Sequence, residues 1–262
     1  MAGEQQAPVG MHPSFAKVIE QRQRLKEKLS KIKHKIGVYS AKGGVGKTTV
    51  AVNLAYTLSK MGKSVGLLDA DIDCPNLPMF LGIEEKIDTS VQPFKPIIKD
   101  GVKVASTAML VDEASKPIIW RGPMITKMLN EMFDGIDWGE LDYLIMDLSP
   151  GTSDAPLTIM QLLQLDGFVI VTTPQKIAAV NSGRSGLMAK KLNVSLLGVV
   201  ENMSSGKQSE HTTELLKTLD TDLLGTVSRS DDFNSASDSG KVPVLSNEKI
   251  RKEFEAIAKK LP

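Results

Sequence analysis

Short runs of β-branched and aliphatic residues alternate with longer stretches of helical periodicity from residue 35 to the end of the chain. The runs predicted as strands are residues 36–40, 65–69, 102–107, 143–147, 168–173, 196–200 and 223–227. Apolar strands separated by helices form right-handed βαβ units, whose sheet is mostly parallel and covered on both faces. The pattern therefore predicts an α/β protein with a mostly parallel, twisted sheet and helices on both faces.

The first 34 residues do not follow this alternation. Residues 1–13 are polar and contain two prolines, which predicts a disordered head. Residues 14–34 are predicted as an N-terminal helix, because apolar side chains recur near helical spacing with Lys or Arg between them. We expect this helix to pack on a single domain formed by residues 35–262, although a basic amphipathic helix can also bind a membrane or a partner's groove.

A second amphipathic segment lies at residues 249–261, where lysines stand beside regularly spaced apolar residues. The apolar positions are Ile250, Phe254, Ile257, Ala258 and Leu261. Most such helices pack on the core of their own domain, and a membrane-binding tail is the alternative.

A glycine-rich segment, residues 40–49 with the sequence SAKGGVGKTT, stands between the first predicted strand and a predicted helix. A strand that ends in such a turn directs successive backbone N–H groups toward one point, where the helix dipole also favours negative charge. This predicts a nucleotide phosphate site, in which Lys47 reaches the β- and γ-phosphates and the Thr48 hydroxyl binds Mg²⁺. The predicted nucleotide-binding residues of the loop are Ala41, Lys42, Gly43, Gly44, Val45, Gly46, Lys47, Thr48 and Thr49.

Aspartates stand at the ends of two other predicted strands. The fourth predicted strand ends in Asp147, and a carboxylate at such a position orients Mg²⁺ or its water. The second leads into Asp69, Asp71 and Asp73, whose alternate spacing predicts side chains on the same side near the phosphates. Asp69 and Asp71 could instead cap a loop, which is a common role of Asp.

A turn follows Asp147, in residues 148–154 with the sequence LSPGTSD. Its backbone is a candidate sensor of the γ-phosphate, although Pro and Gly after an Asp are also a common turn signal. All of these motifs stand at the carboxyl ends of predicted strands, where ligands bind in open parallel sheets.

The glycine-rich loop departs from the usual phosphate-binding pattern, because Ala41 replaces its first glycine and Lys42 follows. The sequence KGGVGKTT resembles the deviant Walker A loop of the ATPases related to MinD, ParA and the nitrogenase iron protein. The resemblance implies that Lys42 crosses a homodimer interface to the partner's phosphates and that Asp71 positions the attacking water, so that both are catalytic. Taken alone, Lys42 would be a solvated loop lysine.

Several further segments resemble the Mrp/ApbC branch of these ATPases. They are residues 120–124, 137–143, 147–154, 172–175 and 198–204, and the resemblance covers residues 35–245 in order. It implies a cytoplasmic homodimer that binds ATP and Mg²⁺, hydrolyses ATP slowly to ADP and phosphate, and carries or helps assemble iron–sulfur clusters on client proteins such as an iron–sulfur apoprotein. It also implies that Asn202 hydrogen-bonds the nucleotide base, whereas an Asn there could simply end a strand.

The chain departs from the Mrp pattern where that branch places C-x-x-C to bridge a cluster across the dimer. Residues 204–211 read SSGKQSEH, and Cys74 is the only cysteine of the chain. Because clusters need soft thiolate ligands, we expect residues 204–211 not to hold one. Cys74 is expected to be a buried structural cysteine, with a ligand role as the alternative, and His211 to be solvated rather than a ligand.

Three serines also depart from the branch. Ser149 stands where it usually has a second proline, Ser153 where it usually has glycine, and Ser228 where a proline usually follows the last strand. Ser149 and Ser153 lie in the predicted γ-phosphate sensor, where they could alter turnover, and Ser228 lies in the loop on the side of the base.

Composition narrows the classes of function. The chain has 262 residues, a formal net charge of +1 and no dominant block of like charge, so it gives no strong signal for nucleic acid or a membrane surface. One cysteine allows no disulfide within the chain and suits a reducing cytosol. Two alternatives stay open, namely a MinD/ParA-like ATPase of spatial organisation, and a phosphate-loop kinase, which would give Lys42 no task.

Overall fold

The computed structural model describes residues 13–72, 74–110, 122–151, 154–163 and 165–262. Its strands are β1 (Ile32–Tyr39), β2 (Val65–Ala70), β3 (Ile97–Lys99), β4 (Val102–Ser106), β5 (Leu141–Leu148), β6 (Gly167–Thr172), β7 (Leu196–Ser204) and β8 (Leu223–Ser228). They form one sheet in the order β3-β4-β2-β5-β1-β6-β7-β8. Neighbouring strands are parallel except β3 and β4. The predicted mostly parallel α/β sheet is confirmed.

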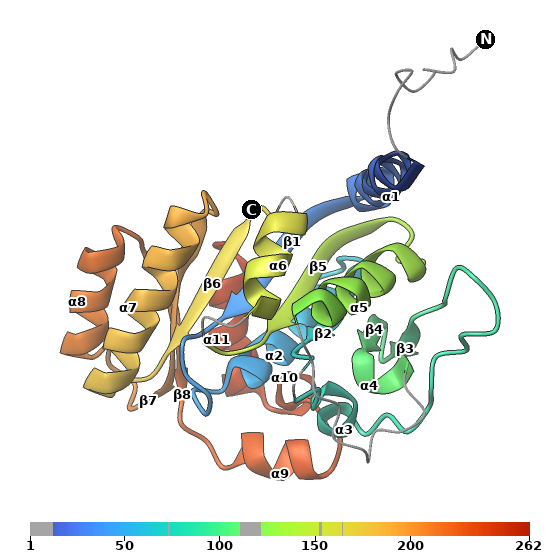
Figure 1. Ribbon diagram of the computed structural model, residues 1–262. Helices are drawn as coiled ribbons and strands as arrows, with labels where there is room; N and C mark the ends of the chain where they lie inside the picture. Colours follow the sequence, from blue (N-terminus) through green and yellow to red (C-terminus); the bar gives the residue numbers. More distant parts are fainter. Residues whose placement is uncertain (1–12, 73, 111–121, 152–153, 164) are drawn as a thin grey trace.

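Helices cover both faces of this sheet (Figure 1). One face carries α5 (Gly122–Gly135), α6 (Asp154–Leu162), α7 (Lys176–Lys191) and α8 (Glu210–Leu219), and the other carries α2 (Lys47–Lys60), α10 (Pro243–Ser246) and α11 (Glu248–Ala258). The remaining helices are α1 (Pro13–Ser30), α3 (Leu77–Leu81), α4 (Thr107–Leu110) and α9 (Asp232–Asp238). Because both faces are covered, the strands β2 and β6 are buried along their whole length.

The short antiparallel strand β3 was not among the predicted strands. It pairs with β4 through a two-residue turn, Asp100-Gly101, in which both residues have positive φ, 47° and 85°. An Asp-Gly pair is a strong hairpin signal because it accepts this backbone conformation. The sequence therefore contained the signal, but three residues gave no hydrophobic alternation to go with it.

The N-terminal helix ends earlier than the predicted range of residues 14–34. Helix α1 stops at Ser30, and β1 already begins at Ile32, which is buried and pairs with Leu141 of β5. Leu25 and Leu29 of α1 are buried in the core. The described part of this helix thus packs its apolar side on the domain, while the predicted head before Pro13 lies outside the described residues.

Polar contacts hold α1 beside α5. Arg24 and Lys28 approach the carboxylate of Asp134 at 3.6 Å and 3.3 Å, and the Lys28 ammonium also donates to the backbone carbonyl of Asp134. Figure 1 shows α1 at the side of the sheet, near one end of α5.

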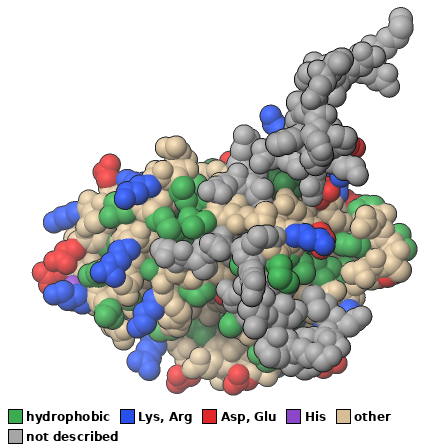
Figure 2. Space-filling view, in the orientation of Figure 1, with side chains coloured by type: hydrophobic (Ala, Val, Ile, Leu, Met, Phe, Trp, Pro, Cys, Tyr) green, Lys and Arg blue, Asp and Glu red, His purple; other side chains and the backbone are tan. Residues whose placement is uncertain are grey.

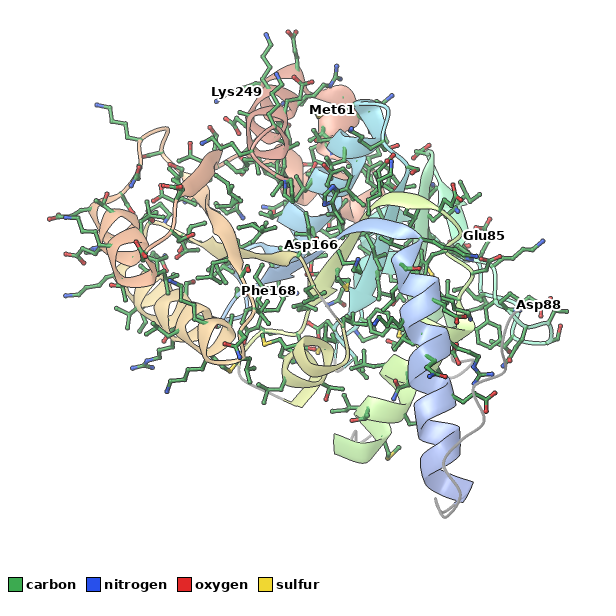
Figure 3. All side chains as sticks on the ribbon, turned by 90° about the horizontal axis from the view of Figure 1, so that it is seen from above. Met61, Glu85, Asp88, Asp166, Phe168 and Lys249 are labelled. Carbon is green, nitrogen blue, oxygen red and sulfur yellow. The ribbon has the colours of Figure 1, made fainter. Side chains whose placement is uncertain are left out.

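The C-terminal amphipathic helix packs on the core, as predicted. The apolar residues of α11, among them Ile250, Phe254 and Ile257, are buried. Helix α11 lies against α2 and β8, and Figure 3 shows Lys249 of α11 on the same side of the molecule as Met61, which follows α2. In the described parts of the chain, no helix combines the length and the apolar character that a membrane crossing requires.

The sheet brings the predicted motifs to one edge. Strand β1 lies between β5 and β6, and the chain leaves β1 toward β2 on one side and later crosses to β6 on the other. Asp147 of β5 is in register with both Val38 of β1 and Asp69 of β2. The carboxyl ends of β1, β2 and β5 therefore meet at the point where open α/β sheets bind ligands.

Candidate functional site

The glycine-rich loop has a backbone that only glycine adopts easily. Gly44 and Gly46 have φ values of 81° and 80°, in the left-handed region. A Cβ atom on Gly46 would stand only 2.1 Å from Nδ2 of Asn202, so the close approach also excludes a side chain there. Helix α2 begins directly at Lys47 without a side-chain cap, which leaves its first N–H groups free of a capping side chain and suited to phosphate oxygens.

Lys47, Thr48 and Asp147 form one compact cluster. The Lys47 ammonium lies 2.6 Å from Oδ1 of Asp147, and the Thr48 hydroxyl donates to Oδ2 of the same carboxylate at 2.5 Å. Lys47 and Asp147 are both buried. Burial raises the pKa of Asp147, and the charge of Lys47 together with the hydrogen bonds from Lys47 and Thr48 acts against that rise.

The oxygen atoms of this cluster suit a magnesium ion. A hydroxyl and a carboxylate from two different elements are hard ligands of the kind that Mg²⁺ takes beside substrate phosphates. Among the described residues, no group of three or more His, Cys, Asp or Glu side chains is placed to hold a metal. In proteins, Mg²⁺ usually keeps several waters and binds one or two protein oxygens together with substrate phosphates.

Asp69 supports the loop after β2. Its carboxylate is buried and accepts hydrogen bonds from the backbone N–H groups of Asp71 and Leu77, both at 3.1 Å, and from the Ser106 hydroxyl at 3.0 Å. Burial and the nearby Asp147 raise the pKa of Asp69 to about 7. Asp69 thus caps the loop that carries Asp71, which is the alternative role considered for it.

Asp71 faces the phosphate-loop lysine. Its Oδ2 lies 3.9 Å from the Lys47 ammonium, and its Oδ1 accepts from the Ser149 hydroxyl at 3.1 Å and from the backbone N–H of Cys74 at 3.3 Å. The structure therefore brings Asp71 together with Lys47 and Asp147, whereas Asp73 lies outside the described residues.

The turn after Asp147 is tied to the end of β1. The backbone N–H of Gly151 donates to the Ser40 carbonyl at 3.0 Å, and the buried Tyr39 hydroxyl donates to the Gly151 carbonyl. These contacts join the proposed γ-phosphate sensor to the start of the phosphate loop. Tyr39 was not among the predicted site residues, because it ends a strand predicted only as an apolar run, although a phenol directly before the loop was a usable signal.

Asn202 contacts the phosphate loop itself. It is buried at the end of β7, and its amide donates to the carbonyl of Val45 at 2.9 Å. The predicted contact of Asn202 with a nucleotide base stays a prediction, while the observed contact holds the loop next to Gly46.

Lys42 lies on the exposed side of the loop. It lines a cavity of about 220 Å³, whose other walls come from the loop, from the segment after β6 and the start of α7, from the end of β7 and from the segment after β8. These walls include Gly43, Thr173, Gln175 and Arg229. Lys42 is exposed, and no ion pair of this lysine occurs among the described residues.

Helix α7, which contributes Ala178 to this cavity, packs beside α8. Figure 2 shows hydrophobic side chains interspersed with Lys and Arg over this part of the visible face. The exposed apolar residues of α7 are Ile177, Val180 and Leu187.

The loop after β7 is organised by a buried glutamate. Glu201 accepts from the backbone N–H and the hydroxyl of Ser209, at 3.0 Å and 2.7 Å. Ser209 in turn caps α8 by accepting from the N–H of Thr212. Burial would raise the pKa of Glu201, but hydrogen bonds from Thr212, Ser209 and Ser204 lower it below its usual value.

Two smaller expectations can be compared with the structure. The side chain of Cys74 is exposed, so the prediction of a buried structural cysteine is wrong. The reason is its place in the loop that turns outward between β2 and α3, two residues after the buried Ile72. Ser228 ends β8 and binds Glu253 of α11 through its N–H and its hydroxyl, at 3.0 Å and 2.5 Å, which is a contact that a proline could not make.

Known proteins share both the sequence and the fold of this chain. The chain is 40% identical to an iron–sulfur cluster carrier protein of Methanocaldococcus jannaschii, over 95% of this chain and 91% of that protein. It is 47% identical to an iron–sulfur cluster carrier protein of Pyrococcus abyssi, over 70% of this chain and 65% of that protein.

Solved structures agree with this relationship. A nucleotide-binding protein from Archaeoglobus fulgidus in complex with ADP superposes with a TM-score of 0.75 at 35% identity, over 89% of this chain and 96% of that one. The cell division ATPase MinD of Pyrococcus furiosus superposes with a TM-score of 0.67 at 21% identity, over 87% of this chain and 98% of that one, and shows the shared fold.

The family model of the NUBPL iron-transfer P-loop NTPases, within the ParA group, matches residues 31–262. This range contains the whole sheet from β1 to β8, and it includes the phosphate loop and Asp147. With this match and the near full-length similarity to the M. jannaschii protein, the chain belongs to the family of iron-transfer P-loop NTPases.

Proposed function

We propose that this chain is a Mg²⁺-dependent ATPase, which binds ATP at the loop of residues 41–49 and hydrolyses it slowly to ADP and phosphate. The observation that carries the proposal is the shared carboxylate of Asp147, which the Lys47 ammonium and the Thr48 hydroxyl both contact. Lys47 provides a positive charge for the β- and γ-phosphates, and Thr48 and Asp147 would hold Mg²⁺. Bound there, Mg²⁺ would offset the negative charge of the phosphates.

Asp71 is proposed to position the water that attacks the γ-phosphate. Hydrolysis forms a bond from the water oxygen to the γ-phosphorus and breaks the bond from that phosphorus to the bridging oxygen of ADP, and a proton of the water is released to the solvent. One oxygen of Asp71 lies beside Lys47 and the other is held by Ser149 and Cys74, so the carboxylate has a fixed direction in a nearly buried place. These contacts support the assignment because water positioning requires a group of defined orientation.

Lys42 is proposed to act on the nucleotide of the partner subunit in a homodimer. Its exposure and its place on the rim of the cavity beside the loop support this role. The site is then complete only in the dimer, which would make hydrolysis slow and dependent on association.

The client process is proposed to be the carrying or assembly of iron–sulfur clusters, because the two relatives reported above are named iron–sulfur cluster carrier proteins. This chain has one cysteine, which does not fit a cluster bound by C-x-x-C pairs. We therefore place the chain in that process as a nucleotide-switched adaptor that acts on client proteins, without a cluster in residues 204–211.

Incubation of the purified protein with ATP labelled on the γ-phosphate tests the proposed reaction. We expect Mg²⁺-dependent release of labelled inorganic phosphate and ADP-dependent separation of the dimer on size-exclusion chromatography. Transfer of label to an added small molecule instead of water would support a kinase and contradict the proposal. Release of phosphate at the same rate with and without Mg²⁺ would contradict the assignment of Thr48 and Asp147.

A further inference from the structure

Ser149 contacts Asp71, the residue proposed above to position the attacking water. It is the first residue after β5, two residues beyond Asp147, and its side chain is 1% exposed. Its hydroxyl donates to Oδ1 of Asp71 at 3.1 Å, and the carbonyl of Ala70 lies 3.4 Å away. A hydroxyl has one hydrogen, and the shorter contact to the charged acceptor is the stronger one.

The contact fixes one half of the Asp71 carboxylate. Oδ1 accepts from Ser149 and from the backbone N–H of Cys74, while Oδ2 points to Lys47 at 3.9 Å. The two hydrogen bonds to Oδ1 come from the segment after β5 and from the loop after β2. Together they fix the rotation of the carboxylate about the Cβ–Cγ bond of Asp71. Because Ser149 is buried, the bond competes little with water and holds its geometry better than an exposed one would.

We infer that Ser149 is a positioning residue, which orients Asp71 so that Oδ2 faces the phosphate side of the site. This inference rests on the proposed role of Asp71 in hydrolysis. A proline, the residue that the resembling Mrp branch usually has at this point, has no side-chain donor, so the device belongs to this chain's own sequence. Orientation of a water-positioning group affects the chemical step and leaves the contacts that bind nucleotide unchanged.

The test compares Ser149→Ala with a matched control, Ser182→Ala. Ser182 is also 1% exposed, and its hydroxyl donates to a backbone carbonyl, that of Val171, at 3.1 Å. Both substitutions remove one buried hydroxyl, but only the first removes a partner of Asp71. Steady-state ATP hydrolysis, the affinity for a non-hydrolysable ATP analogue and the melting temperature are measured for each variant and for the parent.

We expect Ser149→Ala to lower kcat on the order of tenfold, with KM and analogue affinity within about twofold of the parent. Ser182→Ala should keep the parent's kcat, and Ser149→Thr, which retains the hydroxyl, should keep most of it. A kcat of Ser149→Ala equal to that of the parent would overturn the inference. A loss of analogue affinity or of melting temperature that matches the loss of kcat would also overturn it, since it would show a structural role.

Asp71→Ala separates this inference from the proposed function. If the parent hydrolyses ATP, Asp71→Ala does not, and Ser149→Ala runs at the full rate, only the positioning role of Ser149 fails. If Asp71→Ala hydrolyses ATP at the parent's rate, the proposed role of Asp71 fails and the inference about Ser149 fails with it.

Discussion

The carboxyl ends of β1, β2 and β5 and the segment after β7 lie on the same edge of one sheet, but they differ in what their polar side chains contact. At the first region the buried Lys47 and Asp147 and the half-buried Asp71 face one another beside the glycine-rich loop. At the second region the buried Glu201 turns to the backbone and hydroxyl of Ser209 and fixes the start of α8. The charged groups of the first region are placed to meet a ligand, whereas the charge of Glu201 in the second region stabilises the local fold.

The difference indicates how nucleotide binding and cluster binding, the two parts of a cluster carrier's function, can separate. Binding and hydrolysis of a nucleotide depend on backbone N–H groups and hard oxygen ligands, all of which this chain retains. Holding a cluster depends on thiolates, and the segment after β7 offers hydroxyl, amide and ammonium groups instead. If the two regions are separate in this way, substitutions at the phosphate loop change nucleotide chemistry, and substitutions after β7 change stability.

The largest effect is expected from the two lysines of the phosphate loop. Lys47→Ala should weaken ATP binding by more than about 100-fold, because it removes a buried charge that faces the phosphates and leaves Asp147 unpaired. Lys42→Ala should bind ATP within a few-fold of the parent but lose hydrolysis and ATP-dependent dimerisation. Calorimetric titration with ATP and sedimentation with and without ATP measure both. Equal loss of binding in the two variants would contradict the assignment of Lys42 to the partner's nucleotide.

The next effect concerns the carboxylates of the same region. Asp71→Ala should lower hydrolysis by about 100-fold or more while Mg·ATP stays bound, so that the dimer accumulates. Asp147→Ala should instead weaken the dependence on Mg²⁺ and the affinity for nucleotide together. Single-turnover hydrolysis and nucleotide binding at several Mg²⁺ concentrations distinguish the two. Parent-like hydrolysis by Asp71→Ala would transfer the role to another carboxylate, such as Asp69 or Asp154.

The sequence predicted the phosphate-loop region well, because its chemistry depends on residues close together along the chain. Gly44, Gly46 and Lys47 belong to one turn, and a turn's backbone follows from its own glycines. The structure places Asp147 beside Lys47 and Thr48, and the signal in the sequence was a buried strand that leads into a carboxylate, because Asp is rarely buried without a partner. The fold followed from the alternation of strands and helices in the same way.

Contacts between distant segments could not be predicted from the sequence. The Ser149 hydroxyl meets Asp71 across 78 positions of sequence, and Tyr39 meets Gly151 across 112. Such pairs depend on strand order and register, which bring β1, β2 and β5 side by side. The exposure of Cys74 depends likewise on the path of a loop, for which neighbouring residues give no periodic signal.

A smaller effect, on stability, is expected in the segment after β7. Glu201→Ala should lower the free energy of unfolding by about 2 kcal/mol, because two donors of Ser209 lose their buried acceptor. The affinity for ATP should stay within about twofold of the parent. Chemical denaturation and ATP titration test this, with Ser209→Ala as a milder variant, expected to cost about 1 kcal/mol through the lost cap.

The pH dependence of the same variant gives a second readout. The folded-state pKa of Glu201 is lower than its usual value, so its contribution to stability is complete above the unfolded pKa, which is about 4.3. The contribution is lost as the pH falls through the folded-state value. The parent and Glu201→Ala should therefore differ most at neutral pH and converge in acid, whereas a constant difference down to acid pH would contradict the role of the charged carboxylate.

The last prediction is that anaerobic reconstitution with iron and sulfide leaves no iron–sulfur cluster bound to the purified protein. A cluster that bridges two subunits needs about four soft ligands, and a homodimer of this chain contains two thiols, both from Cys74. Each Cys74 stands in the exposed loop beside Asp71, where the backbone N–H of the cysteine already bonds that carboxylate. After desalting we expect no visible absorption band, no bound iron or sulfide, and unchanged ATP-dependent dimerisation. About four irons and four sulfides per dimer, with the absorption lost in Cys74→Ser, would make Cys74 the ligand and show that the nucleotide region also carries the cluster.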